Sequence, residues 1–168
     1  MISIPSAQPC LLLVDDEPVN LRVLKQILQP DYQLMFATSG EQALQLVAQQ
    51  RPDLILSDVM MPQLTGFDLC QRLKADPALS AIPLIFVTAL KEEIDEAKGF
   101  ALGAVDYITK PVSPAIVRAR VKTHLSLVQA DELKRTRLQV IESLGRAAEY
   151  KDSQRPTTYS RCELSRGL

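Results

Sequence analysis

The sequence carries almost no net charge. Its 168 residues include 19 Lys and Arg against 20 Asp and Glu, which gives a formal net charge of −1. A protein that binds nucleic acid through the phosphate backbone is expected to carry a surplus of positive charge. The balanced composition therefore gives no support to nucleic acid as a partner.

Cysteine is scarce, and long apolar runs are missing. The three cysteines, Cys10, Cys70 and Cys162, lie far apart and form no Cys-x-x-Cys pair. We expect reduced thiols, with Cys10 and Cys70 buried. No segment approaches the about 20 apolar residues of a membrane-spanning helix, and the N-terminal residues lack the basic region of a signal peptide. These absences predict a cytoplasmic protein without a membrane partner.

Five short apolar runs alternate with segments of helical periodicity. The runs are typical of β-strands and cover residues 10–16, 32–37, 53–58, 83–89 and 105–110. Helical spacing of apolar residues recurs between them, within residues 18–28, 39–50, 65–76 and 94–104. Strands that are apolar throughout and alternate with helices indicate a parallel sheet covered on both faces. The sequence therefore predicts an α/β fold. Its first, third and fourth strands should be central, and the second should lie at an edge.

A long helix should follow the last strand. Ser113 can cap it with Pro114 at its first position, and no further glycine occurs before Gly145. Its first part can pack on the sheet, whereas the sequence beyond Val128 turns polar. We predict a domain over residues 1–127, a linker helix over 128–150 and a disordered tail over 151–168.

The linker helix leaves two interpretations open. Apolar spacing resumes in its second half, at Leu138, Ile141 and Leu144. This pattern favours pairing with a second copy of the chain, although the heptads are broken. The alternative is a single solvated helix, and the pattern does not decide between them.

Reactive side chains stand at the carboxyl ends of four predicted strands. The first strand ends in Asp15 and Asp16, the third in Asp58, the fourth in Thr88 and the fifth in Lys110. Each of these residues alone is unremarkable, but ligands of an open parallel sheet bind beyond this edge. Neighbouring carboxylates repel one another, and Mg²⁺, which prefers oxygen ligands, relieves the repulsion. The set therefore contains the groups needed for phosphoryl transfer onto a carboxylate.

The motifs that contain these residues resemble the receiver domain of two-component response regulators. They read "VDDE", "SDVMMPQLTGFDLCQRL", "VTA" and "GAVDYITKP", and the resemblance covers about residues 9–127. It implies a flavodoxin-like, doubly wound, five-stranded parallel sheet of order 2-1-3-4-5, with helices on both faces and an extended C-terminal helix. It also implies a signalling switch rather than a catalytic enzyme, whose partner is a sensor histidine kinase or a phosphotransfer protein.

The resemblance assigns roles to individual residues. Asp58 matches the phosphoacceptor, and Thr88 and Lys110 match the groups that contact the phosphoryl oxygens. Thr88 and Tyr107 match the switch pair, in which Thr88 moves toward the phosphoryl group and Tyr107 rotates inward. The proline after Lys110 restricts the lysine backbone, and a cis bond there could aim its side chain inward.

The resemblance also implies a bound Mg²⁺. Asp16, Asp58 and the backbone carbonyl of Met60 match its ligands, and Asp15 matches a further acid that acts through water. Gly66 should give the loop after Asp58 room to fold over the site.

The segment "LQVIESLGRAAEYKD" resembles the lead-in to HD-GYP cyclic-di-GMP phosphodiesterase domains. Such domains need several histidine and aspartate metal ligands, and this chain has one histidine, His124, which we expect on a helix surface. We therefore expect an absent or truncated output domain and no phosphodiesterase activity.

Two other classes of protein use similar folds. Phosphohydrolases of the haloacid-dehalogenase type follow their nucleophile with a second aspartate, whereas Asp58 is followed by "VMM". Flavin-binding modules have a phosphate loop rich in Ser, Thr and Gly, whereas "DDEPVN" is acidic and would repel a phosphate. Turnover of a phosphate monoester would indicate the first class, and a coloured protein the second.

Overall fold

The computed structural model describes residues 7–89 and 93–152, so Cys162 and residues 153–168 of the tail predicted over 151–168 lie outside it. Strands and helices alternate along the chain, as the sequence predicts. Their bounds are β1 Cys10–Val14, α1 Pro18–Leu28, β2 Gln33–Ala37, α2 Gly40–Gln49, β3 Leu54–Ser57, α3 Gly66–Ala75, β4 Leu84–Thr88, α4 Glu93–Ala101, β5 Asp106–Thr109 and α5 Pro114–Asp152.

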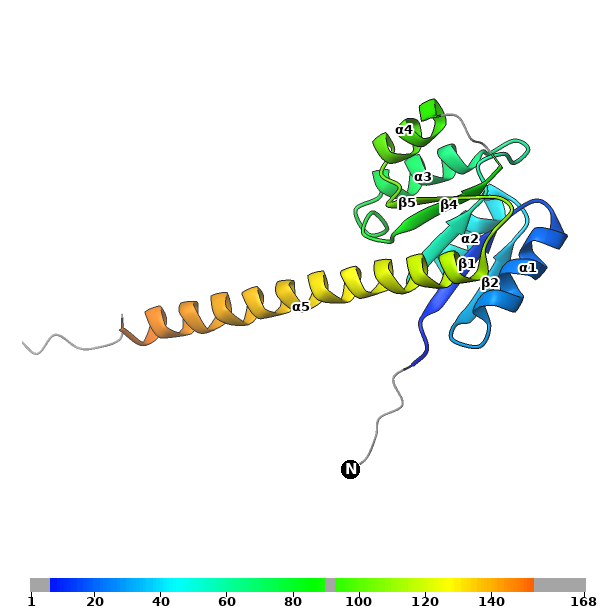
Figure 1. Ribbon diagram of the computed structural model, residues 1–168. Helices are drawn as coiled ribbons and strands as arrows, with labels where there is room; N and C mark the ends of the chain where they lie inside the picture. Colours follow the sequence, from blue (N-terminus) through cyan, green and yellow to red (C-terminus); the bar gives the residue numbers. More distant parts are fainter. Residues whose placement is uncertain (1–6, 90–92, 153–168) are drawn as a thin grey trace, which may run out of the picture. The chain divides into compact units, whose positions relative to one another are not determined.

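The five strands form one parallel sheet of order β2-β1-β3-β4-β5 (Figure 1). This order confirms the prediction, including the central positions of β1, β3 and β4 and the edge position of β2. The side chains of β1, β3 and β4 are buried throughout, whereas both β2 and β5 contain exposed residues. Burial thus follows position in the sheet, as expected when helices cover both faces.

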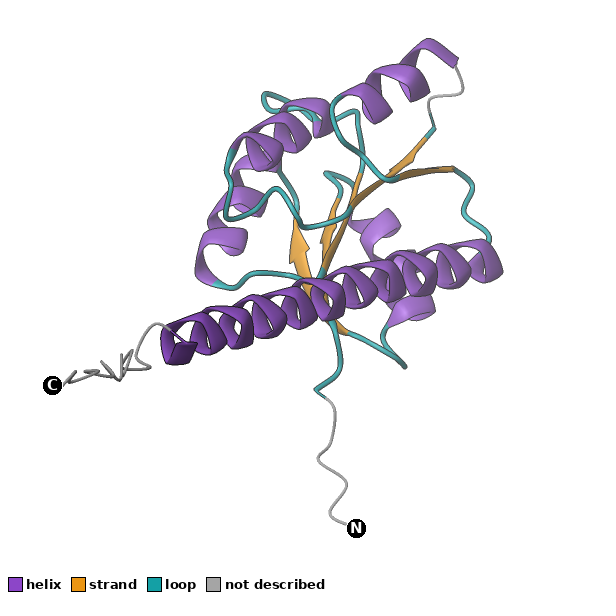
Figure 2. Ribbon diagram, turned by 90° about the vertical axis from the view of Figure 1, so that its left-hand side faces the viewer, coloured by secondary structure: helices purple, strands orange, loops and turns teal. Residues whose placement is uncertain are grey.

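Each face of the sheet is covered by its own helices (Figures 1 and 2). On one face, α1 and the beginning of α5 pack on β1, β3 and β4 through the apolar residues Leu21, Leu24, Ile27, Leu28, Val117, Val121 and Leu125. On the other face, α2 and α3 contribute Ala43, Val47, Phe67, Leu69, Cys70 and Leu73. Cys10 and Cys70 are buried free thiols, as predicted.

Short-range signals explain where several helices begin and end. Ser39 caps α2, because its hydroxyl accepts a hydrogen bond from the backbone N–H of Gln42 at 3.1 Å. Thr65 and Asp68 form a capping box at the start of α3. Gly103 follows α4 with a φ of +103°, a conformation that glycine adopts without strain.

The register of the strands aligns their carboxyl ends. Val14 of β1 pairs with Ser57 of β3, and the ladder continues past both strands, since the Asp58 N–H donates to the Val14 carbonyl at 2.9 Å. In the same way, the N–H of Lys110 donates to the Thr88 carbonyl at 2.9 Å. The residues that follow β1, β3 and β5 are therefore held at one edge of the sheet.

By the density of its contacts, the chain divides into two compact units, Met1–Val128 and Gln129–Leu168. The assignment of 128–150 as a linker and of 151–168 as a disordered tail stays a prediction. In the described part of the second unit, several large apolar side chains of α5 are exposed, namely Leu133, Leu138, Val140, Ile141, Leu144 and Tyr150. No helix within residues 7–89 and 93–152 is both long and apolar enough to cross a membrane.

Candidate phosphoryl-accepting site

Lys110 lies between two of the predicted acids. Its ammonium nitrogen is 2.7 Å from Oδ2 of Asp15 and 3.1 Å from Oδ2 of Asp58. Both carboxylates are buried, with 2% of Asp15 and 8% of Asp58 exposed. The peptide bond between Lys110 and Pro111 is cis, the conformation that the sequence suggested. The structure thus brings residues from the ends of β1, β3 and β5 into direct contact.

The two acids raise the pKa of the Lys110 ammonium. Burial alone would lower this pKa, but the hydrogen bond to Asp15 and the negative charges of Asp58 and Asp15 outweigh it. Lys110 is therefore a permanent cation at neutral pH, held where it can neutralise a developing anion.

Asp15, Asp16 and Asp58 form one cluster of oxygen ligands. Each offers a carboxylate oxygen within 4.8 Å of the others, and Asp16 is the most exposed of the three. If all three are ionised, Lys110 compensates only one of their charges. The chemistry of this set fits Mg²⁺, a hard divalent cation that binds through carboxylates and retains several waters. Among the residues that the structure describes, no other group of three or more acids, histidines or cysteines lies close enough together to share a metal ion.

The remaining oxygen of Asp58 is held by the backbone that follows it. Oδ1 accepts hydrogen bonds from the N–H groups of Val59 at 2.7 Å and Met60 at 3.3 Å. Val59 is buried, whereas the Met60 side chain is exposed beside the site. Gly66 lies against this turn so closely that a Cβ atom would stand 2.1 Å from the carbonyl oxygen of Asp58. A close backbone contact therefore requires glycine at this position.

A pocket of about 390 Å³ opens over these residues. Its lining brings together predicted site residues from four strand ends with three residues to which the sequence analysis assigned no role, Glu17, Asn20 and Ala89. The lining residues are Asp16, Glu17, Asn20, Asp58, Met60, Thr88, Ala89 and Lys110. Only the packing of α1 on the sheet places Asn20 here, and no motif marked it.

The two predicted switch residues lie on neighbouring strands, and Thr88 is one of the residues that line the pocket. Thr88 is buried at the end of β4, and Tyr107 is buried on β5, with 7% of its surface exposed. The Tyr107 ring packs edge to face on Phe86, with ring centroids 5.7 Å apart, and Phe86 packs in the same manner on Phe67. Tyr107 is thus buried in this structure, and its role as a switch residue stays a prediction.

A second polar cluster joins β5 to α5. Asp106 binds Arg120 through Oδ1 and lies 2.9 Å from Nε2 of His124 through Oδ2. Burial alone would raise the pKa of Asp106, but the hydrogen bond with His124, the backbone N–H of Tyr107 and the charge of Arg120 lower it. His124 lies on α5 as expected, but only 15% of its side chain is exposed, because tertiary packing supplies an acidic partner 18 residues away.

Comparison with known proteins finds relatives of the part of the chain that contains the predicted site residues. The family model described as "Response regulator receiver domain" matches residues 11–122. A "Probable cyclic di-GMP phosphodiesterase" of Vibrio cholerae is 42% identical over 119 residues, which are 71% of this chain and 27% of that protein. "Response regulator PleD" of Caulobacter vibrioides is 41% identical over 127 residues, which are 74% of this chain and 28% of that protein.

A solved structure agrees with these relatives. The signal receiver domain of a signal transduction histidine kinase from Syntrophus aciditrophicus is 39% identical, with a TM-score of 0.66. The similarity covers 70% of this chain and 90% of that domain. By contrast, the chain spans less than a third of the length of the Vibrio and Caulobacter relatives.

Proposed function

Because the chain belongs to the response regulator receiver family of two-component systems, we propose that it accepts a phosphoryl group on Asp58. The observation that carries the proposal is the position of Lys110, 2.7 Å from Asp15 and 3.1 Å from Asp58, inside a cluster of three carboxylates. The donor is a phosphohistidine on a sensor histidine kinase or a phosphotransfer protein.

In the proposed reaction, a carboxylate oxygen of Asp58 attacks the phosphorus of the donor. A bond between carboxylate oxygen and phosphorus forms, the bond between phosphorus and the imidazole nitrogen breaks, and the electron pair stays on that nitrogen. Lys110 neutralises the negative charge that the phosphoryl oxygens bring, and the hydroxyl of Thr88 donates to one of them. Bound Mg²⁺ would supply further charge neutralisation, held by Asp15 through water and by Asp16, Asp58 and the Met60 carbonyl.

Incubation with a small phosphodonor and Mg²⁺, followed by intact-mass measurement, tests this proposal. The wild-type chain should gain the mass of one phosphoryl group, and the Asp58→Asn variant should gain none. Asp31→Asn is a matched control, because Asp31 is an exposed carboxylate outside the site. Equal labelling of the wild type and the Asp58→Asn variant would refute Asp58 as the acceptor.

We propose that phosphorylation acts on the surface made by α4, β5 and α5 through Thr88 and Tyr107. Tyr107 is already buried against Phe86, so the phosphoryl group would favour this position rather than create it. Tyr107→Ala should leave phosphorylation of Asp58 intact and abolish any difference in partner binding or oligomeric state between the two forms. A persisting difference would exclude Tyr107 from the switch.

We further propose that the linker helix pairs with a second copy of the chain. Leu138 and Ile141 are exposed and lie three residues apart, so they share one face of α5. In multi-angle light scattering, the full chain should be a dimer, and both removal of residues 130–168 and Ile141→Glu should produce monomers. Gln139→Glu is the control, because residue 139 projects from the opposite face. A monomeric wild type would leave the helix as a solvated linker.

The chain itself should have no cyclic-di-GMP phosphodiesterase activity. The activity named for the Vibrio relative belongs to a protein of which this chain matches 27%. His124, the single histidine, is bound to Asp106 and lies outside the cluster of acids that can share a metal ion. Measurable hydrolysis of cyclic-di-GMP by the pure chain would overturn this proposal.

A further inference from the structure

Asn20 is the only asparagine in the sequence, and it lies at the edge of the phosphoryl-accepting site. It belongs to the first turn of α1, four residues before Leu24, which is buried against the sheet. Residues four apart share one face of a helix, so the packing of Leu24 directs Asn20 toward the end of the sheet where the acids lie.

The amide group of Asn20 contacts two carboxylates at once. Its Nδ2 atom is 3.3 Å from Oδ1 of Asp15 and 3.3 Å from Oε2 of Glu17. An amide nitrogen has two protons to donate, so one neutral side chain can serve both acids. A carboxylate of the same shape at position 20 would instead add negative charge to a cluster that already has an excess.

Two hydrogen-bond donors, the backbone N–H of Glu17 and the amide of Asn20, orient the Asp15 carboxylate. Oδ1 of Asp15 accepts from the backbone N–H of Glu17 at 2.9 Å and from Asn20, while Oδ2 faces Lys110 at 2.7 Å. Two donors on Oδ1 fix the plane of the carboxylate, and this plane aims Oδ2 at the ammonium. Rotation of Asp15 would remove the shorter of the two contacts that hold Lys110 beside Asp58.

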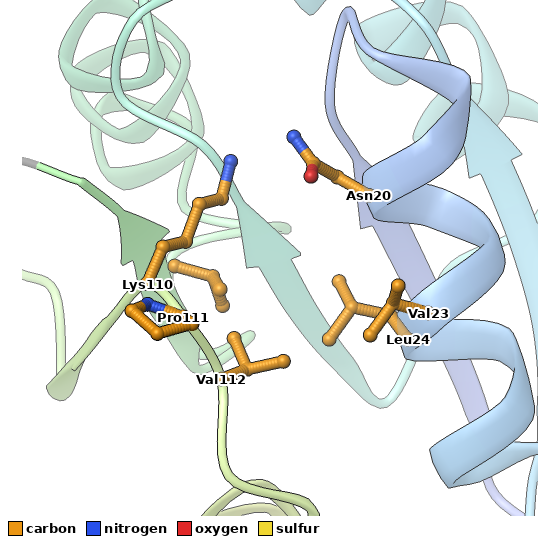
Figure 3. Close-up of a pocket in the computed structure, with 7 residues that line it drawn as sticks. Asn20, Val23, Leu24, Lys110, Pro111 and Val112 are labelled. Carbon is orange, nitrogen blue, oxygen red and sulfur yellow. The ribbon is translucent and has the colours of Figure 1, made fainter.

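Asn20 also borders a second pocket, so apolar packing does little to hold its side chain. An apolar pocket of about 480 Å³ lies between α1 and the segment after β5, so Asn20 has no dense packing on that side. Figure 3 shows Asn20 and Lys110 at the same end of this pocket, with Val23, Leu24 and Val112 at the other. The contacts with Asp15 and Glu17, rather than apolar packing, therefore hold the amide in place.

We propose that Asn20 is a positioning residue for phosphoryl acceptance. It holds Asp15 in the orientation that keeps Lys110 beside Asp58, and its amide bridges the carboxylates of Asp15 and Glu17. This inference rests on the proposed function, because it deepens the role of the same site.

The test compares Asn20→Ala and Asn20→Asp with the wild type and with Val23→Ala. Asn20→Asp keeps the shape and removes the donor, whereas Val23→Ala alters the same helix and pocket without touching an acid. The two readouts are the dissociation constant for Mg²⁺ alone, measured by calorimetry, and the maximum rate of phosphorylation by acetyl phosphate at saturating Mg²⁺. Thermal unfolding of each variant shows whether the fold is retained.

We expect the maximum rate to fall about fivefold in Asn20→Ala and at least as much in Asn20→Asp, the size expected for losing a long hydrogen bond to a charged group. The dissociation constant for Mg²⁺ should change in both variants and stay unchanged in Val23→Ala. Wild-type rates and Mg²⁺ affinity in either Asn20 variant would overturn the inference. If the wild type accepted no phosphoryl group, the proposed function would fail, while the Mg²⁺ titrations would still decide whether Asn20 positions the acids.

Discussion

Replacing Gly66 by alanine should damage both the fold and the site. Gly66 is the first residue of α3, and its N–H donates to the carbonyl of Val59 at 2.9 Å. An added Cβ would stand 2.1 Å from the carbonyl oxygen of Asp58 and 2.8 Å from Cα of Val59. Both neighbours are backbone atoms of the turn that carries Asp58, the proposed phosphoacceptor, so no side chain can rotate away to make room.

The size of the effect follows from this contact. Ordinary van der Waals contact begins near 3.4 Å, so α3 and the Asp58 turn must separate by more than 1 Å. Overpacking usually costs about 1–3 kcal/mol, and a backbone-to-backbone clash belongs at the upper end of that range. For a domain of this size, the midpoint of thermal unfolding should fall by about 10 °C. The shift also moves Asp58 away from Lys110, so the phosphorylation rate should drop.

Thermal unfolding and phosphorylation by acetyl phosphate measure the two effects, and Gly145→Ala is the matched control. Gly145 lies inside α5, exposed, with no heavy atom within 4 Å of an added Cβ. The same substitution there should leave phosphorylation unchanged and favour the helix by about 0.5–1 kcal/mol. A Gly66→Ala variant with wild-type unfolding and wild-type phosphorylation would show that the reasoning from this contact is wrong.

Two further predictions concern the core and the cluster that joins β5 to α5. Phe86→Ala should destabilise the domain by about 3–5 kcal/mol, because it removes a fully buried ring between Phe67 and Tyr107. Urea denaturation measures the loss of stability. A loss no larger than that of Phe86→Leu would contradict the prediction. Asp106→Asn should destabilise the chain at neutral pH, with a loss that shrinks as the pH falls. The lowered pKa of Asp106 means that its contribution is fully present above the unfolded value of 3.8 and disappears as the pH falls through the folded value. Denaturation at about pH 6 and about pH 3 measures the difference, and an equal loss at both would be evidence against the cluster with His124.

Much of the fold, and the meeting of most candidate site residues at one edge of the sheet, were predictable from the order of residues along the chain. Apolar runs that alternate with helical patterns require a parallel sheet with two covered faces, and a parallel sheet collects its strand ends at one edge. That is why the sequence alone predicts that Asp15, Asp58 and Lys110 lie together. Local signals such as Ser39 at the start of α2 were readable for a similar reason, since the contacts of a helix cap lie within a few residues.

Other features depend on how separate elements pack, and short-range patterns do not encode them. Asn20 reaches Asp15 because Leu24 fixes the rotation of α1 on the sheet. His124 meets Asp106 because the beginning of α5 lies along β5, which changes an expected surface histidine into a bound one. These contacts follow from the rotation of helices against the sheet, a quantity that depends on the whole core at once. The order of the strands brings the acids and Lys110 to one edge of the sheet. The packing of α1 on the sheet then brings the amide of Asn20 to Asp15.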